Sequence, residues 1–77
     1  MDTSLIEFKK GFRLKSGKVV TTDAIMLSYE EANQDAKATA KKLGSSKSVF
    51  EEIVNGGRVL IPRNSIDYIE FYLSEVS

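Results

Sequence analysis

The chain has 77 residues with 11 basic and 11 acidic side chains, and it contains neither cysteine nor histidine. Histidine titrates near neutrality and cysteine supplies the best protein nucleophile and a soft metal ligand, so most catalytic and metal-binding designs are excluded. We therefore expect no enzymatic activity, no cofactor and no metal site. A chain this short is expected to form one domain over residues 1–77.

The sequence also bears on location and assembly. Its apolar runs are far too short to cross a bilayer, and residues 1–4 do not open a signal peptide, so we expect a cytoplasmic protein with no membrane contact. A small core without disulfide or metal reinforcement favours self-association, and we expect a homo-oligomer. Chains of this size and kind are typical of phage or bacterial accessory proteins.

Charge is distributed unevenly along the chain. Residues 1–47 carry nine basic and six acidic side chains, a net charge of +3, whereas residues 48–77 carry two and five, a net charge of −3. Five basic residues follow one another without an intervening acid: Lys9, Lys10, Arg13, Lys15 and Lys18. This cluster is either a solvated surface or a binding site for phosphate or an acidic protein.

A β-hairpin is predicted around the turn Ser16-Gly17. A two-residue loop would place Leu14 opposite Val19, with Arg13, Lys15 and Lys18 together on the other face. The first arm is expected to begin near Leu5, with Gly11 as a bulge or bend that resets the alternation, and the second arm to extend toward Met26.

A helix is predicted over residues 29–43. Ser28 and Glu31 form a capping box before it, and Gly44 stands where a left-handed C-terminal cap is expected. Its apolar positions recur at helical spacing, and they are Tyr29, Ala32, Ala36, Ala40 and Leu43.

Residues 49–54 allow two interpretations. A second capping box, from Ser48 to Glu51, favours a short helix that ends at Asn55-Gly56-Gly57. The alternative is a strand followed by an Asn55-Gly56 hairpin turn. We prefer the helix because Phe50-Glu51-Glu52-Ile53 breaks strict alternation.

Two further strands are predicted near the end of the chain. Residues 58–62 form a short strand that Pro62 limits, and residues 65–76 fit either a strand or a helix. We prefer the strand because Ile, Tyr and Phe dominate the segment. The predicted fold is α+β, in the order β-β-α-(α)-β-β, with antiparallel hairpins packed on the helix over residues 29–43.

Seven residues, Gly-Arg-Val-Leu-Ile-Pro-Arg at 57–63, resemble a stretch of the swapped-hairpin transition-state regulators, small dimeric DNA-binding proteins. The residues that follow, from Asn64 onward, depart from that family's pattern. The resemblance is too short to assign the chain to the family.

The function we expect is that of a small regulatory protein that acts through protein–protein contacts. The candidate partner-binding residues are Arg13, Lys15, Lys18, Arg58, Arg63, Tyr68 and Tyr72. One alternative is a small anionic, nucleotide-like ligand held between subunits by arginines and lysines. Another is nucleic acid bound by the basic hairpin, although the neutral net charge argues against counterion release on the necessary scale.

Overall fold

The structure is a computed structural model that describes residues 4–75. Among these residues three strands precede the helix and three follow it. In chain order the elements are β1 (Leu5–Leu14), β2 (Val19–Thr21), β3 (Ile25–Ser28), α1 (Tyr29–Leu43), β4 (Val49–Val54), β5 (Gly57–Pro62), the 3-10 turn η1 (Arg63–Ser65) and β6 (Ile66–Glu75). The predicted α+β class, with antiparallel strands and one main helix, is confirmed.

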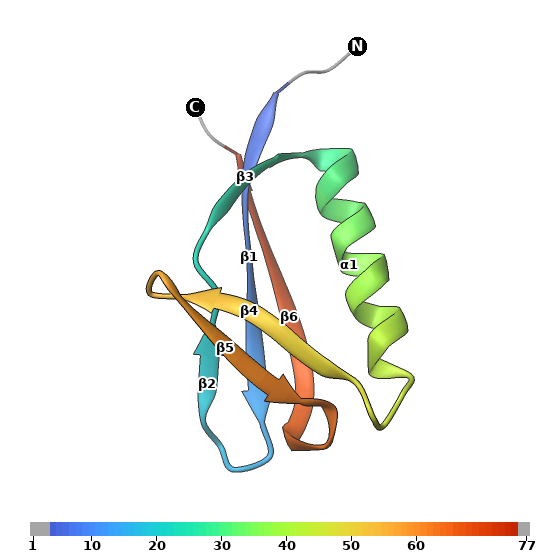
Figure 1. The fold of residues 1–77 in the computed structure, drawn as a ribbon. Coiled ribbons are helices and arrows are strands. Elements are labelled where there is room, and N and C mark those ends of the chain that lie inside the picture. The colour runs from blue at the N-terminus through green and yellow to red at the C-terminus, as the bar shows by residue number, and fades with distance from the viewer. Residues whose placement is uncertain (1–3, 76–77) are drawn as a thin grey trace.

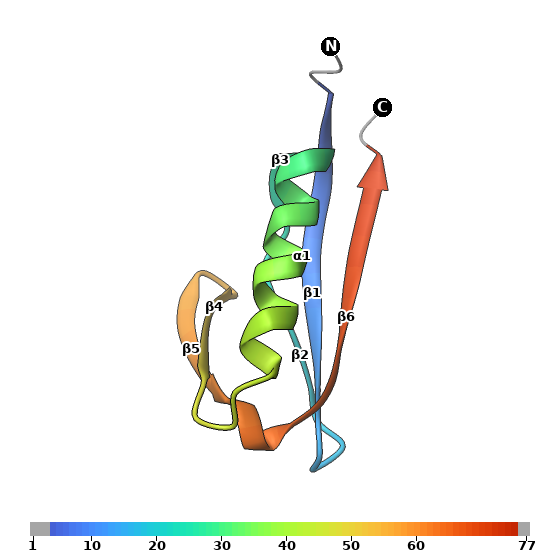
Figure 2. The same cartoon turned by 90° about the vertical axis from the view of Figure 1, so that its right-hand side faces the viewer.

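The long strand β1 organises the fold. It pairs with β2 and β3 along one edge and with β6 along the other, and every pairing is antiparallel. The β4–β5 hairpin forms a separate two-stranded sheet. Figures 1 and 2 show that this hairpin and α1 lie side by side on one face of the four-stranded sheet. The last two predicted strands do not form a hairpin with each other, because β5 pairs with β4 and β6 returns to pair with β1.

The β1–β2 hairpin has a register that differs from the prediction. Arg13 lies opposite Val19, and Phe12 lies opposite Val20. The Leu14 N–H donates to the Lys18 carbonyl and the Gly17 N–H donates to the Leu14 carbonyl, both at 2.9 Å, so the loop has three residues rather than two. Gly17 takes the positive φ that such a loop requires.

The predicted bulge at Gly11 is wrong. Alternation runs unbroken along β1, and Ile6, Phe8, Lys10 and Phe12 are all buried on the face toward the helix and hairpin. The register shift lies instead between Arg13 and Leu14, in the pairing with β6. The second arm is also interrupted, since β2 ends at residue 21 and β3 begins at residue 25.

Helix α1 has the predicted bounds, Tyr29–Leu43, but its C-terminal cap differs from the prediction. The Glu31 N–H donates to Ser28 Oγ and the Ser28 N–H donates to Glu31 Oε1, both at 3.1 Å, which confirms the capping box. Gly44 adopts a right-handed conformation, with φ −73°, so the left-handed cap is wrong. Arg63 explains this end of the helix, because its Nε donates to the Leu43 carbonyl at 2.6 Å.

The preferred helix over residues 49–54 is also wrong, because this segment is β4. Phe50 pairs with Ile61 across the hairpin, and both side chains enter the core with Phe12. Asn55 and Gly56 have positive φ and make the turn that the alternative interpretation required. Glu52 faces inward, and this polar residue at an inward position is what broke the alternation in the sequence.

The remaining predicted strands are confirmed as β5 and β6. The core has two clusters along the inner face of the sheet. Phe12, Phe50, Ile61 and Ile66 form one beneath the hairpin, and Ile6, Phe8 and Ala32 form the other beneath the helix. The sheet face opposite α1 and the hairpin is not covered by any described residue (Figure 2).

Candidate functional site

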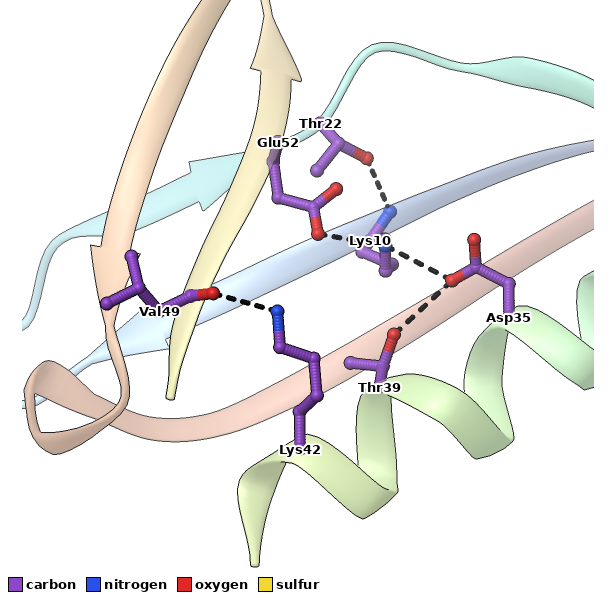
Figure 3. A network of polar contacts seen from close by, with 7 residues as sticks. All are labelled: Lys10, Thr22, Asp35, Thr39, Lys42, Val49 and Glu52. Carbon is purple, nitrogen blue, oxygen red and sulfur yellow. Dashed lines mark hydrogen bonds and ion pairs between the residues drawn. The ribbon is translucent and has the colours of Figure 1, made fainter. Parts of the chain in front are cut away.

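Lys10 of β1 connects α1 and the β4–β5 hairpin on the inner face of the sheet. Its side chain is buried, and Nζ lies 3.1 Å from Asp35 Oδ1 on α1 and 3.0 Å from Glu52 Oε2 on β4 (Figure 3). Thr39 donates to the same Asp35 oxygen at 3.3 Å. Because each partner comes from a different element, this network fixes the helix and the hairpin over β1.

A pocket of about 110 Å³ borders this network. Its lining includes Phe8, Thr22, Asp23, Ile25 and Ile53 beside the three charged residues. Thr22 accepts from the Lys10 backbone N–H, and Asp23 accepts from the N–H groups of Asn55 and Gly56 at 2.7 and 2.8 Å. These polar groups hold the structure together, and a pocket of this size is smaller than the usual ligand site.

The uncovered outer face of the sheet brings together residues from both ends of the chain. Side chains alternate along each strand, so the odd-numbered residues of β1 and their partners on β6 share this face. Arg13 lies opposite Tyr68, and Lys9 lies opposite Tyr72. We call this set the outer face, and it comprises Leu5, Glu7, Lys9, Gly11, Arg13, Val19, Thr21, Met26, Ser28, Tyr68, Glu70, Tyr72 and Ser74.

A hydrogen-bonded group occupies the centre of the outer face. Arg13 Nε donates to Glu70 Oε1 at 2.6 Å, and the Tyr72 hydroxyl donates to the same oxygen at 3.0 Å. The hydrogen bond from Arg13, followed by that from Tyr72, lowers the pKa of Glu70, and the same Glu70 contact raises the pKa of Arg13. The carboxylate therefore orients both an arginine and a tyrosine, two residue types enriched at protein-binding hot spots.

Gly11 makes room for the Tyr72 ring. A Cβ atom at residue 11 would lie 3.0 Å from Tyr72 Cε2 and 3.2 Å from its hydroxyl oxygen, closer than ordinary contact. Lys9 Nζ stands 6.0 Å from the centroid of the same ring. Tyr68 makes the neighbouring aromatic surface and is 52% exposed. The outer face thus presents two tyrosines beside a fixed arginine.

The predicted basic cluster does not form one patch. Lys15 lies instead near Arg63, and the two line a pocket of about 330 Å³ with Leu43, Gly44 and Ser46. Arg63 already donates to the carbonyls of Leu43 and Ile66. The pocket adjoins the C-terminal end of α1, where the helix dipole disfavours an anion.

Two other candidate residues lie apart from the outer face. Lys18 borders a depression between β2 and the β4–β5 hairpin. Arg58 is on the solvent side of the hairpin, where it forms an exposed ion pair with Glu51 at 3.2 Å. Of the seven residues singled out from the sequence, the structure unites Arg13, Tyr68 and Tyr72.

Sequence reasoning missed Lys10, Asp35 and Glu52 as a buried network, and Glu70 as the organiser of the outer face. A signal for Lys10 was available, because it occupies the inward position between Phe8 and Phe12 if alternation is not reset. Glu70 had no such signal, since its partner Arg13 is 57 residues away in the chain.

Comparisons of this chain with known protein families, with curated proteins and with solved structures gave no match. Within residues 4–75, no group of three or more acidic side chains is arranged to hold a metal ion. No helix in the described part of the chain is long and apolar enough to span a bilayer.

Proposed function

We propose that this chain is a non-enzymatic binding protein that recognises a protein partner through the outer face of its sheet. The observation that carries the proposal is the placement of Arg13, Tyr68 and Tyr72 together on the uncovered side, with Glu70 holding two of them in place. Tyrosine gives a large contact area at low entropic cost, and arginine adds directional hydrogen bonds.

The charge of the outer face favours protein over nucleic acid. Lys9 and Arg13 are balanced by Glu7 and Glu70 on the same face. Binding to a phosphate backbone depends on an excess of free cations, and here the arginine is already paired with a carboxylate. A mixed surface of tyrosines and balanced charges is typical of a protein interface.

Site-specific photo-cross-linking tests the proposal. A benzoylphenylalanine replaces Tyr68 in the full chain, which is then expressed in the cells that encode it. Lys37, which is exposed on α1, provides the control position. We expect position 68 to cross-link to a protein other than the chain itself, with a defined mass, and position 37 to give no such product. Equal cross-linking from both positions, or none from position 68, would overturn the proposal.

Affinity measurements on the identified protein complete the test. With both proteins purified, Tyr68→Ala and Arg13→Ala are each expected to weaken binding about tenfold or more, as for hot-spot residues, while Lys37→Ala leaves it unchanged. Oligothymidine and oligouridine serve as competing probes. Tighter binding of these oligonucleotides, with loss of affinity in Tyr68→Ala, would assign the outer face to nucleic acid instead.

A further inference from the structure

Strand β6 has one free edge. It pairs with β1 along one side, and no described strand pairs with the other side. Its ten residues include no lysine or proline, which commonly protect an exposed edge, and none of its three acidic residues, Asp67, Glu70 and Glu75, falls within Phe71-Tyr72-Leu73-Ser74. An unprotected strand of this length is a template for a further strand.

The backbone groups that face the free edge can be identified. The Thr22 N–H donates to the Lys10 carbonyl at 2.8 Å, so the backbone of Lys10 points toward β2. Because orientation alternates, the odd-numbered residues of β1 point toward β6, as do Tyr68, Glu70 and Tyr72 toward β1. The N–H and C=O groups of Ile69, Phe71 and Leu73 therefore point to the free edge.

The side chains of these three residues add an apolar surface. They lie on the inner face, in register with Phe12, Lys10 and Phe8 of β1. Ile69 and Phe71 are only half-buried, and Leu73 is 42% exposed. A strand added here would gain both hydrogen bonds and apolar contacts.

Helix α1 leaves part of its apolar stripe uncovered beside this edge. Asp35, Ala32 and Thr39 turn toward the sheet and the hairpin, while Tyr29 is 62% exposed and Ala40 is exposed. At 100° per residue, Tyr29, Ala36 and Ala40 project about 100–140° away from Asp35, on the side opposite the hairpin. Figure 1 shows α1 on the β6 side of the sheet, with the hairpin toward β2. The free edge and this helix flank thus border the same unfilled corner.

We propose that the occupant of this corner is a second copy of the chain, whose β6 pairs antiparallel with β6 about a two-fold axis at Phe71. In this register Phe71 faces its own copy and Ile69 faces the partner's Leu73, so apolar residues meet along the inner side. A register centred on Glu70 would oppose two like charges, and one centred on Tyr72 would set the Glu75 carboxylate against Ile69. The result is a continuous eight-stranded sheet.

This inference does not rest on the proposed function, although Tyr68 of the outer face also lies at the proposed seam. Its first test is the mass of the full chain in solution by sedimentation at tens of micromolar, where we expect a dimer. Leu73→Pro removes an N–H that points to the free edge and none that bonds to β1, so it is expected to give a folded monomer. Leu73→Lys is a second edge variant with the same expectation, and Leu60→Lys, at an exposed leucine of β5 away from this edge, is the matched control that stays dimeric.

Cross-linking tests the register, because the natural chain has no cysteine. Tyr68 and Ser74 of the partner would form a pair without direct backbone hydrogen bonds, the closer kind of antiparallel pair. Mixing Tyr68→Cys with Ser74→Cys should give a covalent dimer under oxidation, and neither variant alone should. A monomeric wild-type chain, or edge variants that dimerise like it, would overturn the proposal. A dimer without the mixed cross-link would overturn the register. If Leu73→Lys is monomeric but still binds the protein partner, dimerisation and the proposed function are independent of each other.

Discussion

Lys10 and Glu52 lie 42 residues apart in the chain, and their side chains meet at 3.0 Å between the main sheet and the β4–β5 hairpin. Both occupy inward positions on their strands, where an apolar residue is expected. Each polar residue is tolerated because the other is present, since an unpaired charge in this place would lose its hydration without compensation.

Removing one partner of this pair should therefore be more harmful than removing both. We expect Lys10→Met to destabilise the domain by about 3 kcal/mol, because Glu52 and Asp35 both lose the ammonium group that neutralises them, and Glu52 is only 14% exposed. The double variant Lys10→Met with Glu52→Leu should recover much of that loss, because two apolar side chains then pack together, while Asp35 is 33% exposed and keeps its contact with Thr39. Urea unfolding of the three proteins measures the difference, and equal stability of the single and double variants would contradict the expectation.

The capping box at the start of α1 gives a second prediction. Ser28→Ala removes the acceptor for the Glu31 N–H and should cost about 1 kcal/mol. In a domain of this size the loss should lower the melting midpoint by roughly 4–8 °C. Ser28→Asp retains an acceptor and is the control, for which the midpoint should stay close to that of the wild type. Calorimetry that gives the same midpoint for Ser28→Ala would contradict a contribution from this cap.

We expect the free energy of unfolding to decrease at acidic pH, partly because Glu70 becomes protonated. The Arg13 and Tyr72 hydrogen bonds lower its pKa below the ordinary value of 4.5 in the folded state. The unfolded chain therefore takes up the proton first, so the stabilisation is complete above pH 4.5 and is lost as the pH falls through the lower folded pKa. Glu70→Gln should flatten the decline of the melting midpoint below pH 5, which is about half a unit above that ordinary value. A slope identical to that of the wild type would contradict it.

Asp23 should control the tip of the β4–β5 hairpin. Its carboxylate accepts from the backbone N–H groups of Asn55 and Gly56, which form the turn. Asp23→Ala should destabilise the hairpin by about 1 kcal/mol, because the two hydrogen bonds to a charged acceptor are lost at a partly exposed site. Amide hydrogen exchange by NMR should show faster exchange at residues 55 and 56 while the β1–β6 amides are unchanged. Asp23→Asn, which keeps one acceptor oxygen, should give an intermediate rate.

Some parts of this structure depend mainly on local sequence, and these could be predicted. The capping box of α1 involves residues three apart, so both of its hydrogen bonds join groups that are neighbours in the sequence. The strands β5 and β6 likewise follow from their β-branched and aromatic residues. The absence of cysteine and histidine excluded whole classes of chemistry before any fold was known.

Tertiary structure decided the features in which local signals competed with distant partners. Ser48 and Glu51 carry the pattern of a helix start, yet pairing of Phe50 with Ile61 above Phe12 made the segment a strand. Lys10 and Glu52 are charged residues at inward positions, so they interrupt the apolar pattern that would identify their strands. Their pairing cannot be seen in the sequence, because only the folded chain brings the two charges together. The outer face has the same origin, since Arg13 meets Tyr68 and Glu70 through the pairing of the first strand with the last. Local hydrogen bonds can be recognised from neighbouring residues, whereas packing and ion pairing depend on residues that are distant in the chain.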